Sequence, residues 1–277
     1  MTDTAAVRMP AVAGSFYPSQ PVELSTLVRK LLDQLPIPPQ SGTIIGLISP
    51  HAGYQYSGAT AAHGFRCVEG QTFDTVVVVS PSHREYFRGI SVYPGRAYAT
   101  PLGEMEIDSD LREALVTGDK KITASAKGHV SEHALEVQLP FIQSTLGAAK
   151  LLPIVMGDQR AEYCERLGNK LGEILSGKRT LLIASTDLSH YHDYASANVL
   201  DGVFVADLLS FDPHTLLNHL DAKRTEACGG GPTAAVLIAA KALGADTVHL
   251  LHHCNSGDVT GEHSQVVGYL SATISKS

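Results

Sequence analysis

The sequence predicts an α/β protein with three layers, in which helices cover both faces of a mainly parallel or mixed central sheet. Short β-branched runs such as TIIGLIS (43–49) and DTVVVVS (74–80) are typical of strands that are buried on both faces. Segments with helical spacing, such as residues 21–35, alternate with these runs, and this alternation is typical of a layered sandwich. No linker-like segment divides the 277 residues, so we expect one domain over residues 1–277.

The remaining elements follow from the same two patterns. Further buried strands are expected at residues 150–157, 180–185 and 247–253, and further helices at 134–146, 161–176 and 232–244. Two more strands, with an edge position, are expected at 89–95 and 265–274. The stretch 86–130 is mostly polar, and we expect it to hold a β-hairpin and a short helix over DSDLREALVTG (108–118).

Composition excludes several classes of protein. The net charge of −7 is spread along the chain, so the clustered lysines and arginines of a nucleic-acid surface are missing. The sequence contains no run of about 18 apolar residues, which a membrane-spanning helix would need. The first residues lack the pattern of a signal peptide, so we expect a cytoplasmic protein. The four cysteines form no CxxC pair and are expected to be reduced thiols.

Two histidines follow the ends of predicted strands in the same local context. His51 comes after Ser49-Pro50, and His83 comes after Ser80-Pro81-Ser82. Because ligands bind at the carboxyl ends of the strands in open parallel sheets, we expect both imidazoles at one rim. Either histidine alone could simply belong to a turn, but the repeated context favours a shared metal ion.

A third metal ligand has two candidates in the segment RTEACGGGP. Cys228 lies just before three glycines and the expected helix start at Pro232, where backbone N–H groups and the helix dipole favour an accessible thiolate. Glu226 is the rival, because a carboxylate completes the common two-histidine site for Fe(II).

The segment STDLSHYHD is a candidate for general-base chemistry. His190 could accept a substrate proton near neutral pH, and Asp187 could orient an imidazole. Alternatively, Ser185, Thr186 or Asp187 could cap the next helix.

Three further residues are expected to bind substrate. In SEHALEVQLPF, His133 and Glu136 are three residues apart, on one helix face, although His133 could also be a solvent-facing residue at a helix start. Tyr54 of the segment PHAGY is the third residue expected to bind substrate.

The motifs SPHAGYQYSG, SPSHR, EHALEVQLPF, STDLSHY and ACGGGP, with the opening RMPAVAGSFYP, resemble the Memo family, whose prokaryotic members are called AmmeMemoRadiSam system protein B. The resemblance runs from about Arg8 to Thr273. It implies a fold like that of the class III extradiol dioxygenases and a metal held by His51, His83 and Cys228. In those dioxygenases a glutamate stands in place of the cysteine, and the base histidine resembles His190.

The resemblance and the candidate site residues together lead to an expected function with two alternatives. We expect a dioxygenase-like oxidoreductase that uses non-haem Fe(II), with copper or zinc as other possible metals. A copper- or iron-binding or protein-interaction module without turnover is the first alternative, and a zinc hydrolase or a cysteine-nucleophile enzyme is the second. The family name implies an AMMECR-type protein and a radical SAM protein as partners. No nucleic acid or membrane partner is expected.

Overall fold

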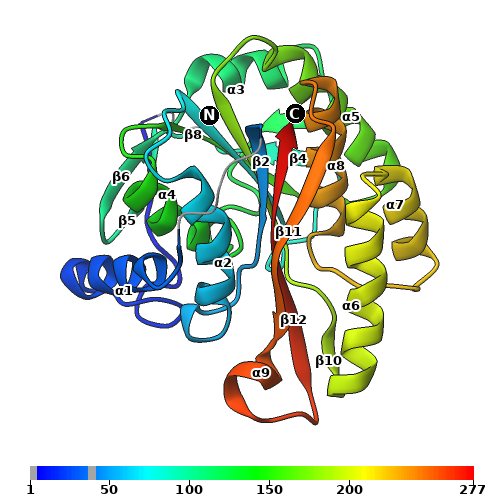
Figure 1. Cartoon of the computed structure of the whole chain (residues 1–277). Coiled ribbons are helices and arrows are strands. Elements are labelled where there is room, and N and C mark those ends of the chain that lie inside the picture. The colour runs from blue at the N-terminus through cyan, green and yellow to red at the C-terminus, as the bar shows by residue number, and fades with distance from the viewer. Residues whose placement is uncertain (1–4, 37–41) are drawn as a thin grey trace.

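A mixed β-sheet forms the centre of the molecule (Figure 1). The computed structural model describes residues 5–36 and 42–277, and nine of the strands in these residues belong to this sheet. They are β2 (Thr43–Ser49), β3 (Thr75–Pro81), β4 (Ile90–Val92), β7 (Ile122–Ala124), β8 (Lys150–Met156), β9 (Thr180–Ser185), β10 (His190–His192), β11 (Thr247–Asn255) and β12 (Val266–Lys276). Their order is β10-β12-β2-β9-β3-β8-β4-β7, and β11 pairs with β12.

The four strands β2, β9, β3 and β8 run parallel through the middle of this sheet. Their sequences are short apolar runs because both faces are covered, and β3 is buried along its whole length. The expected strands at 43–49 and 180–185 have the observed bounds, the one at 74–80 is shifted by one residue relative to β3, and the one at 150–157 ends one residue beyond β8. The carboxyl ends of the four strands therefore meet at one rim, as predicted.

The antiparallel part of the sheet differs from the prediction. The strand expected at an edge over 265–274 is β12, which lies between β2 and β11 and is therefore internal. The strand expected at 247–253 is β11, which is antiparallel to β12 and only partly buried, as its several histidines favour. Because β12 is antiparallel to both β11 and β2, β11 runs in the same direction as β2, and the carboxyl ends of these two strands lie at the same rim. Strand β4 lies between β8 and β7, so it is not an edge strand either.

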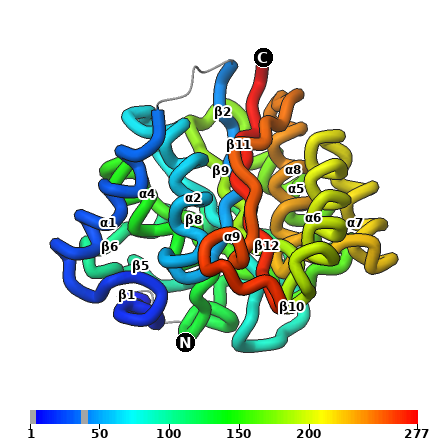
Figure 2. Tube along the Cα trace, turned by 60° about the horizontal axis from the view of Figure 1, so that its bottom comes forward, coloured from blue at the N-terminus to red at the C-terminus, as the bar shows by residue number. Residues whose placement is uncertain are grey.

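Helices cover both faces of the sheet and confirm the three-layer prediction (Figures 1 and 2). On one face lie α1 (Pro21–Asp33), α2 (Tyr54–Val68), the 3₁₀ turn η1 (Glu136–Gln138) and α4 (Leu139–Thr145). On the other lie α3 (Ser109–Val116), α5 (Ala161–Ile174), α6 (Tyr194–Leu209), α7 (Pro213–Asp221) and α8 (Gly230–Ala242). The short α9 (Ser256–Thr260) follows β11 at the rim. Each face therefore has its own hydrophobic core, with the sheet between them.

Helices α2, α6 and α7 were not predicted from the sequence pattern. Helix α2 is rich in small residues and has no clear apolar stripe, because it packs closely on the sheet. A Cβ atom at Gly64 would lie 2.8 Å from the Ser271 hydroxyl of β12, so any larger residue would have to displace that hydroxyl. Helix α6 carries apolar residues on several sides, which hides its helical period.

The polar stretch 86–130 holds the expected hairpin and helix. Strands β5 (Ala97–Thr100) and β6 (Gly103–Glu106) form the hairpin, and β1 (Val7–Arg8) adds to β5 in parallel to give a small separate sheet. Helix α3 begins after Asp108, whose carboxylate accepts the N–H of Leu111 as an N-cap. This small sheet brings the N-terminal segment close to η1.

Candidate metal centre

His51, His83 and Cys228 come together at the carboxyl rim of the sheet. His51 follows β2, His83 follows β3, and Cys228 lies in the loop before α8. The ring centroids of the two histidines are 5.1 Å apart, and the Cys228 sulfur lies 3.0 Å from Nε2 of His51. One ligand atom from each residue lies within 4.8 Å of the others, so the three side chains could hold one metal ion.

The hydrogen bonds of His51 fix which ring nitrogen carries the proton. Its Nδ1 lies 2.9 Å from the hydroxyl of Ser185, which already donates to the Ala134 carbonyl at 2.6 Å and accepts from the Gln138 amide. The Ser185 hydroxyl has one proton, so Nδ1 of His51 must be the donor in this contact. Burial lowers the pKa of His51 well below its ordinary value, which keeps the ring neutral. Its Nε2 therefore presents a lone pair toward Cys228, as a metal ligand needs.

Glu132 fixes the ring of His83 in the same way. Its carboxylate accepts the backbone N–H of His83 and lies 2.9 Å from the ring Nδ1. Burial alone would raise the pKa of Glu132, but the hydrogen bonds from His83 and from backbone amides lower it to about 2. The ionised carboxylate can only accept, so Nδ1 of His83 donates and Nε2 is left free. Carboxylates commonly orient metal-binding histidines in this way.

Glu132 was not among the predicted site residues. The signal was available, because a glutamate directly precedes His133 in SEHALEVQ, but its partner His83 is 49 residues away along the chain. Glu132, His83 and His133 also lie close enough to hold a metal ion. The Glu132 carboxylate, however, already accepts backbone N–H groups of His83, His133 and Ala134, so we assign it an orienting role.

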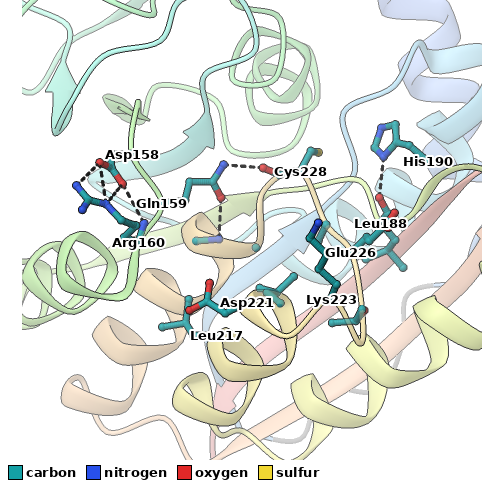
Figure 3. A pocket seen from close by; sticks show the side chains of 15 residues that line it. Asp158, Gln159, Arg160, Leu188, His190, Leu217, Asp221, Lys223, Glu226 and Cys228 are labelled. Carbon is teal, nitrogen blue, oxygen red and sulfur yellow. Dashed lines mark hydrogen bonds and ion pairs between the residues drawn. The ribbon is translucent and has the colours of Figure 1, made fainter.

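Cys228 is held by its backbone. The side-chain amide of Gln159 donates to the Cys228 carbonyl at 2.8 Å and accepts the N–H of Gly231 at 2.9 Å (Figure 3). Helix α8 begins at Gly230, two residues earlier than expected. The Gln159 side chain accepts a hydrogen bond from Gly231, one of the N–H groups that have no partner within the first turn of this helix. The Cys228 sulfur accepts the backbone N–H of Asp187 at 3.3 Å.

The surroundings of Cys228 disfavour the expected thiolate in the free side chain. Burial, and then the charge of Asp187, raise the pKa of the Cys228 thiol above its ordinary value. A bound metal cation would reverse this, because it deprotonates a coordinating thiol. Two imidazoles with Nδ1 held by a hydrogen-bond acceptor, and a thiol that needs a cation to ionise, are a donor set that fits a metal.

Asp187 and His190 both lie beside this cluster. Asp187 is buried, and its carboxylate accepts the backbone N–H of His51 at 2.7 Å. It does not cap a helix, since α6 begins at Tyr194 and is capped by Asp193. Nδ1 of His190 lies 2.8 Å from the Leu188 carbonyl, which can only accept, so Nε2 of His190 is left unprotonated in the neutral ring.

Two residues that were expected to bind substrate have structural roles instead. The Glu136 carboxylate is fully buried and accepts hydrogen bonds from Arg8, Tyr17 and the backbone of Ala11 and Val12. The Tyr54 ring is buried, and its hydroxyl donates to the Val137 carbonyl at 2.6 Å. Neither residue lines the cavities described below, because both tie the N-terminal segment and α2 to η1.

Glu226, the rival metal ligand, lies outside the cluster. Its carboxylate is 2.8 Å from Nε2 of His192, and its side chain is 44% exposed. Among the described residues, the groups that could hold a metal include Cys228 and not Glu226. The two residues are separated by one position only, so the sequence offered no means to choose between them.

Two cavities flank the cluster and share His190 in their walls. The first, of about 630 Å³, reaches Cys228 and is lined by charged side chains such as Arg160, Asp221 and Lys223 (Figure 3). The second, of about 490 Å³, includes His133 and Asp187 in its wall. The ring of His133 lies 4.8 Å from that of His83, and burial lowers the pKa of His133 to about 4. Of the three residues expected to bind substrate, His133 is the one placed at a cavity.

The fold and this cluster define a three-layer α/β protein with a candidate His/His/Cys metal site. The model of the family described as Memo-like protein matches residues 8–273, and the chain belongs to this family. A MEMO1 family protein of Methanosarcina mazei is 38% identical over 266 residues, which cover 95% of this chain and 97% of that protein. A MEMO1 family protein of Nitrosopumilus maritimus is 34% identical over 268 residues, covering 95% and 98% of the two chains.

A solved structure shares the fold at a greater distance. An uncharacterised protein of Escherichia coli K12 superposes with a TM-score of 0.53 and 17% identity, over 84% of this chain and all of that chain. This similarity concerns the fold alone, and its layering is the one that the resemblance to class III extradiol dioxygenases predicts. In the described part of the chain, no helix is long and apolar enough to span a membrane.

Proposed function

We propose that the chain is a metal-dependent, dioxygenase-like oxidoreductase in which His51, His83 and Cys228 bind a non-haem metal ion, with Fe(II) as the first candidate. The observation that carries this proposal is the hydrogen bonding of Nδ1 in both imidazoles. Ser185 and Glu132 each accept a hydrogen bond from the Nδ1–H of one ring, which directs both Nε2 atoms toward the Cys228 side of the cluster. Bound Fe(II) would supply the redox chemistry that dioxygen requires.

The protein's own groups would handle protons and position the substrate. His190 faces both cavities, and its Nε2 is free to accept a substrate proton, since the Leu188 carbonyl holds Nδ1. Asp187 binds the backbone of His51 and lines the second cavity, so it can keep the ligand loop in place next to the substrate. His133, neutral near pH 7, forms the remaining wall between that cavity and His83.

A second candidate function is the binding of Cu(I) without turnover. The observation that favours it is the softness of the donor set, because a thiolate with two imidazoles suits Cu(I) as well as iron. A cysteine nucleophile is less well supported, since the raised pKa of the Cys228 thiol disfavours a free thiolate.

Oxygen uptake by the Fe(II)-loaded protein tests the choice between these two functions. The protein is loaded anaerobically, and dioxygen consumption is followed with small aromatic probes and with the expected AMMECR-type and radical SAM partners. His190→Gln keeps a hydrogen-bonding group that cannot accept the proton, so it should bind metal normally and lose about 10²- to 10⁴-fold in rate. Glu173→Gln, on the exposed face of α5, serves as the control.

Three results would separate the possibilities. No dioxygen uptake by loaded wild-type protein under any of these conditions, together with tight Cu(I) binding, would favour the binding module. Loss of metal in His190→Gln would show that His190 is a ligand and not a base. Full turnover in that variant would remove His190 from the mechanism.

A further inference from the structure

The cavity that contains His133 and Asp187 has largely aromatic walls. Phe16 from the N-terminal segment, Tyr56 of α2, Tyr191 of β10 and Tyr269 of β12 all line it. Four segments that are distant in the sequence therefore contribute a ring to one space of about 490 Å³. Such a lining favours a ligand with a flat or apolar body.

No lysine or arginine lines this cavity, and its acidic side chains are Asp187 and Glu262. Burial raises the pKa of Asp187, so the fixed negative charge of this cavity belongs to Glu262 at its exposed rim. The neighbouring cavity, in contrast, includes Arg160 and Lys223. The aromatic cavity is therefore suited to a neutral or positively charged ligand and opposes an anionic one.

Tyr191 stands out within this wall. Its φ of 63° lies in the left-handed region, where a residue other than glycine is strained, and its side chain is 71% exposed. The ring makes an edge contact with His190, with 5.7 Å between centroids. Tyr56 of α2, which also lines the cavity, is 38% exposed. Strained backbone that holds an exposed aromatic ring beside a candidate base points to ligand contact rather than to core packing.

We propose that this cavity binds an organic cation, namely a protonated amine carried on a short aromatic body. The ammonium group contacts Glu262 and the faces of the rim tyrosines, since cations bind both carboxylates and aromatic faces. The aromatic body extends inward toward His190. This inference names the substrate class of the proposed oxidoreductase and rests on that function for its chemical meaning, although the binding itself requires no turnover.

Three matched probes test the charge preference by calorimetry on the metal-loaded and metal-free protein. They are 2-phenylethylamine, 2-phenylethanol and phenylacetate, which share the ring and differ in the charge of the tail. The amine should bind about tenfold more tightly than the carboxylate, with the alcohol between them. Equal or tighter binding of phenylacetate, or no binding of any probe at millimolar concentration, would overturn the inference.

Variants at the rim locate the preference. Glu262→Gln should remove the advantage of the amine over the alcohol while leaving the alcohol unchanged. Tyr191→Ala should weaken the amine and the alcohol, and Tyr191→Phe should retain binding because it keeps the ring. Glu173→Gln, an exposed carboxylate on α5, should change nothing. An unchanged amine affinity in Glu262→Gln would contradict the assignment of the cation.

The outcome is independent of the metal experiments. Amine selectivity without metal binding at His51, His83 and Cys228 would contradict the proposed function and leave the cation site intact. Normal metal binding without amine selectivity would contradict this inference alone.

Discussion

Two buried glutamates, four residues apart in SEHALEVQ, have opposite roles. Glu132 orients the ring of His83 at the rim of the sheet, with its carboxylate 2.9 Å from Nδ1. Glu136 pairs with Arg8 and accepts backbone N–H groups of Ala11 and Val12, so it anchors the N-terminal segment. Both carboxylates are almost inaccessible to solvent.

The difference teaches that burial of a carboxylate does not identify its role. The two glutamates differ in their partners. Glu132 contacts the candidate metal ligand His83, whereas Glu136 contacts the guanidinium of Arg8, which lies outside the candidate metal site. We expect substitution of Glu136 to affect stability and substitution of Glu132 to affect metal affinity.

The largest expected effect is the loss of stability in Glu136→Gln. This change leaves the buried guanidinium of Arg8 without a counter-charge, which typically costs about 3–5 kcal/mol. Chemical denaturation measures it. The control is Glu104→Gln, because Glu104 pairs with Arg96 on the surface, and exposed pairs contribute about 1 kcal/mol or less. Equal effects of the two variants would contradict the anchoring role of Glu136.

The Arg8 region also predicts a pH dependence of stability through His129. Burial lowers the pKa of His129 to about 3, against about 6.5 in an unfolded chain. Between these values the unfolded chain binds the proton and the folded chain does not, so this contribution to stability is present above pH 6.5 and falls as the pH falls. The loss is about 2 kcal/mol between pH 6.5 and 5.

Denaturation at several pH values, with His129→Gln as the comparison, measures this contribution. In His129→Gln, the free energy of unfolding should depend less steeply on pH in that range, by roughly the slope that corresponds to one bound proton. An identical slope in wild type and variant would mean that His129 is not neutral in the folded protein.

A smaller effect, of a different kind, is expected for Glu132→Gln. The neutral amide is a weaker acceptor for Nδ1 of His83, and loss of such a partner usually lowers metal affinity by about 10- to 100-fold. Competition titrations with a chromophoric chelator measure this affinity. If Glu136→Gln lowers metal affinity as much as Glu132→Gln does, the contrast between the two glutamates fails.

The smallest expected effect concerns Gln159, which holds the Cys228 loop. Gln159→Glu keeps the acceptor for Gly231 but replaces the donor to the Cys228 carbonyl by an oxygen. Displacement of Cys228 should weaken Cu(I) by roughly tenfold and affect harder ions less, because a thiolate favours soft metals. Gln143→Glu, at a hydrogen bond remote from the rim, is the control. An equal loss for all metals would show a general rather than a sulfur-specific effect.

The central sheet could be predicted because its strands are continuous apolar runs. Strands β2 and β9 have the predicted bounds, and the parallel arrangement places His51 and His83 at one rim, as expected. The apolar pattern did not predict α2, because the small residues of this helix are set by its close packing against β12 and form no apolar stripe. It also failed for β11 and β12, because a strand's neighbours and direction are set by pairing far along the chain.

The candidate site could be predicted only for residues with a recognisable local context. His51, His83, Cys228 and His190 each follow a strand or precede a helix, and the structure brings them to one region. Glu132 was missed and Glu136 was misassigned because their roles depend on His83 and Arg8, which are remote in sequence. Helical spacing alone cannot tell a carboxylate at the rim from one beneath the N-terminal segment.

X-ray absorption of the zinc-loaded protein tests the central claim most directly, because it counts sulfur among the metal's neighbours. The arrangement of His51, His83 and Cys228 predicts one sulfur at about 2.3 Å and two imidazole nitrogens at about 2.0–2.1 Å. The sulfur shell should disappear in Cys228→Ser, while Glu226→Gln should leave the spectrum unchanged. A wild-type spectrum with nitrogen and oxygen neighbours only, or full metal loading in a protein that lacks both His51 and His83, would contradict the account.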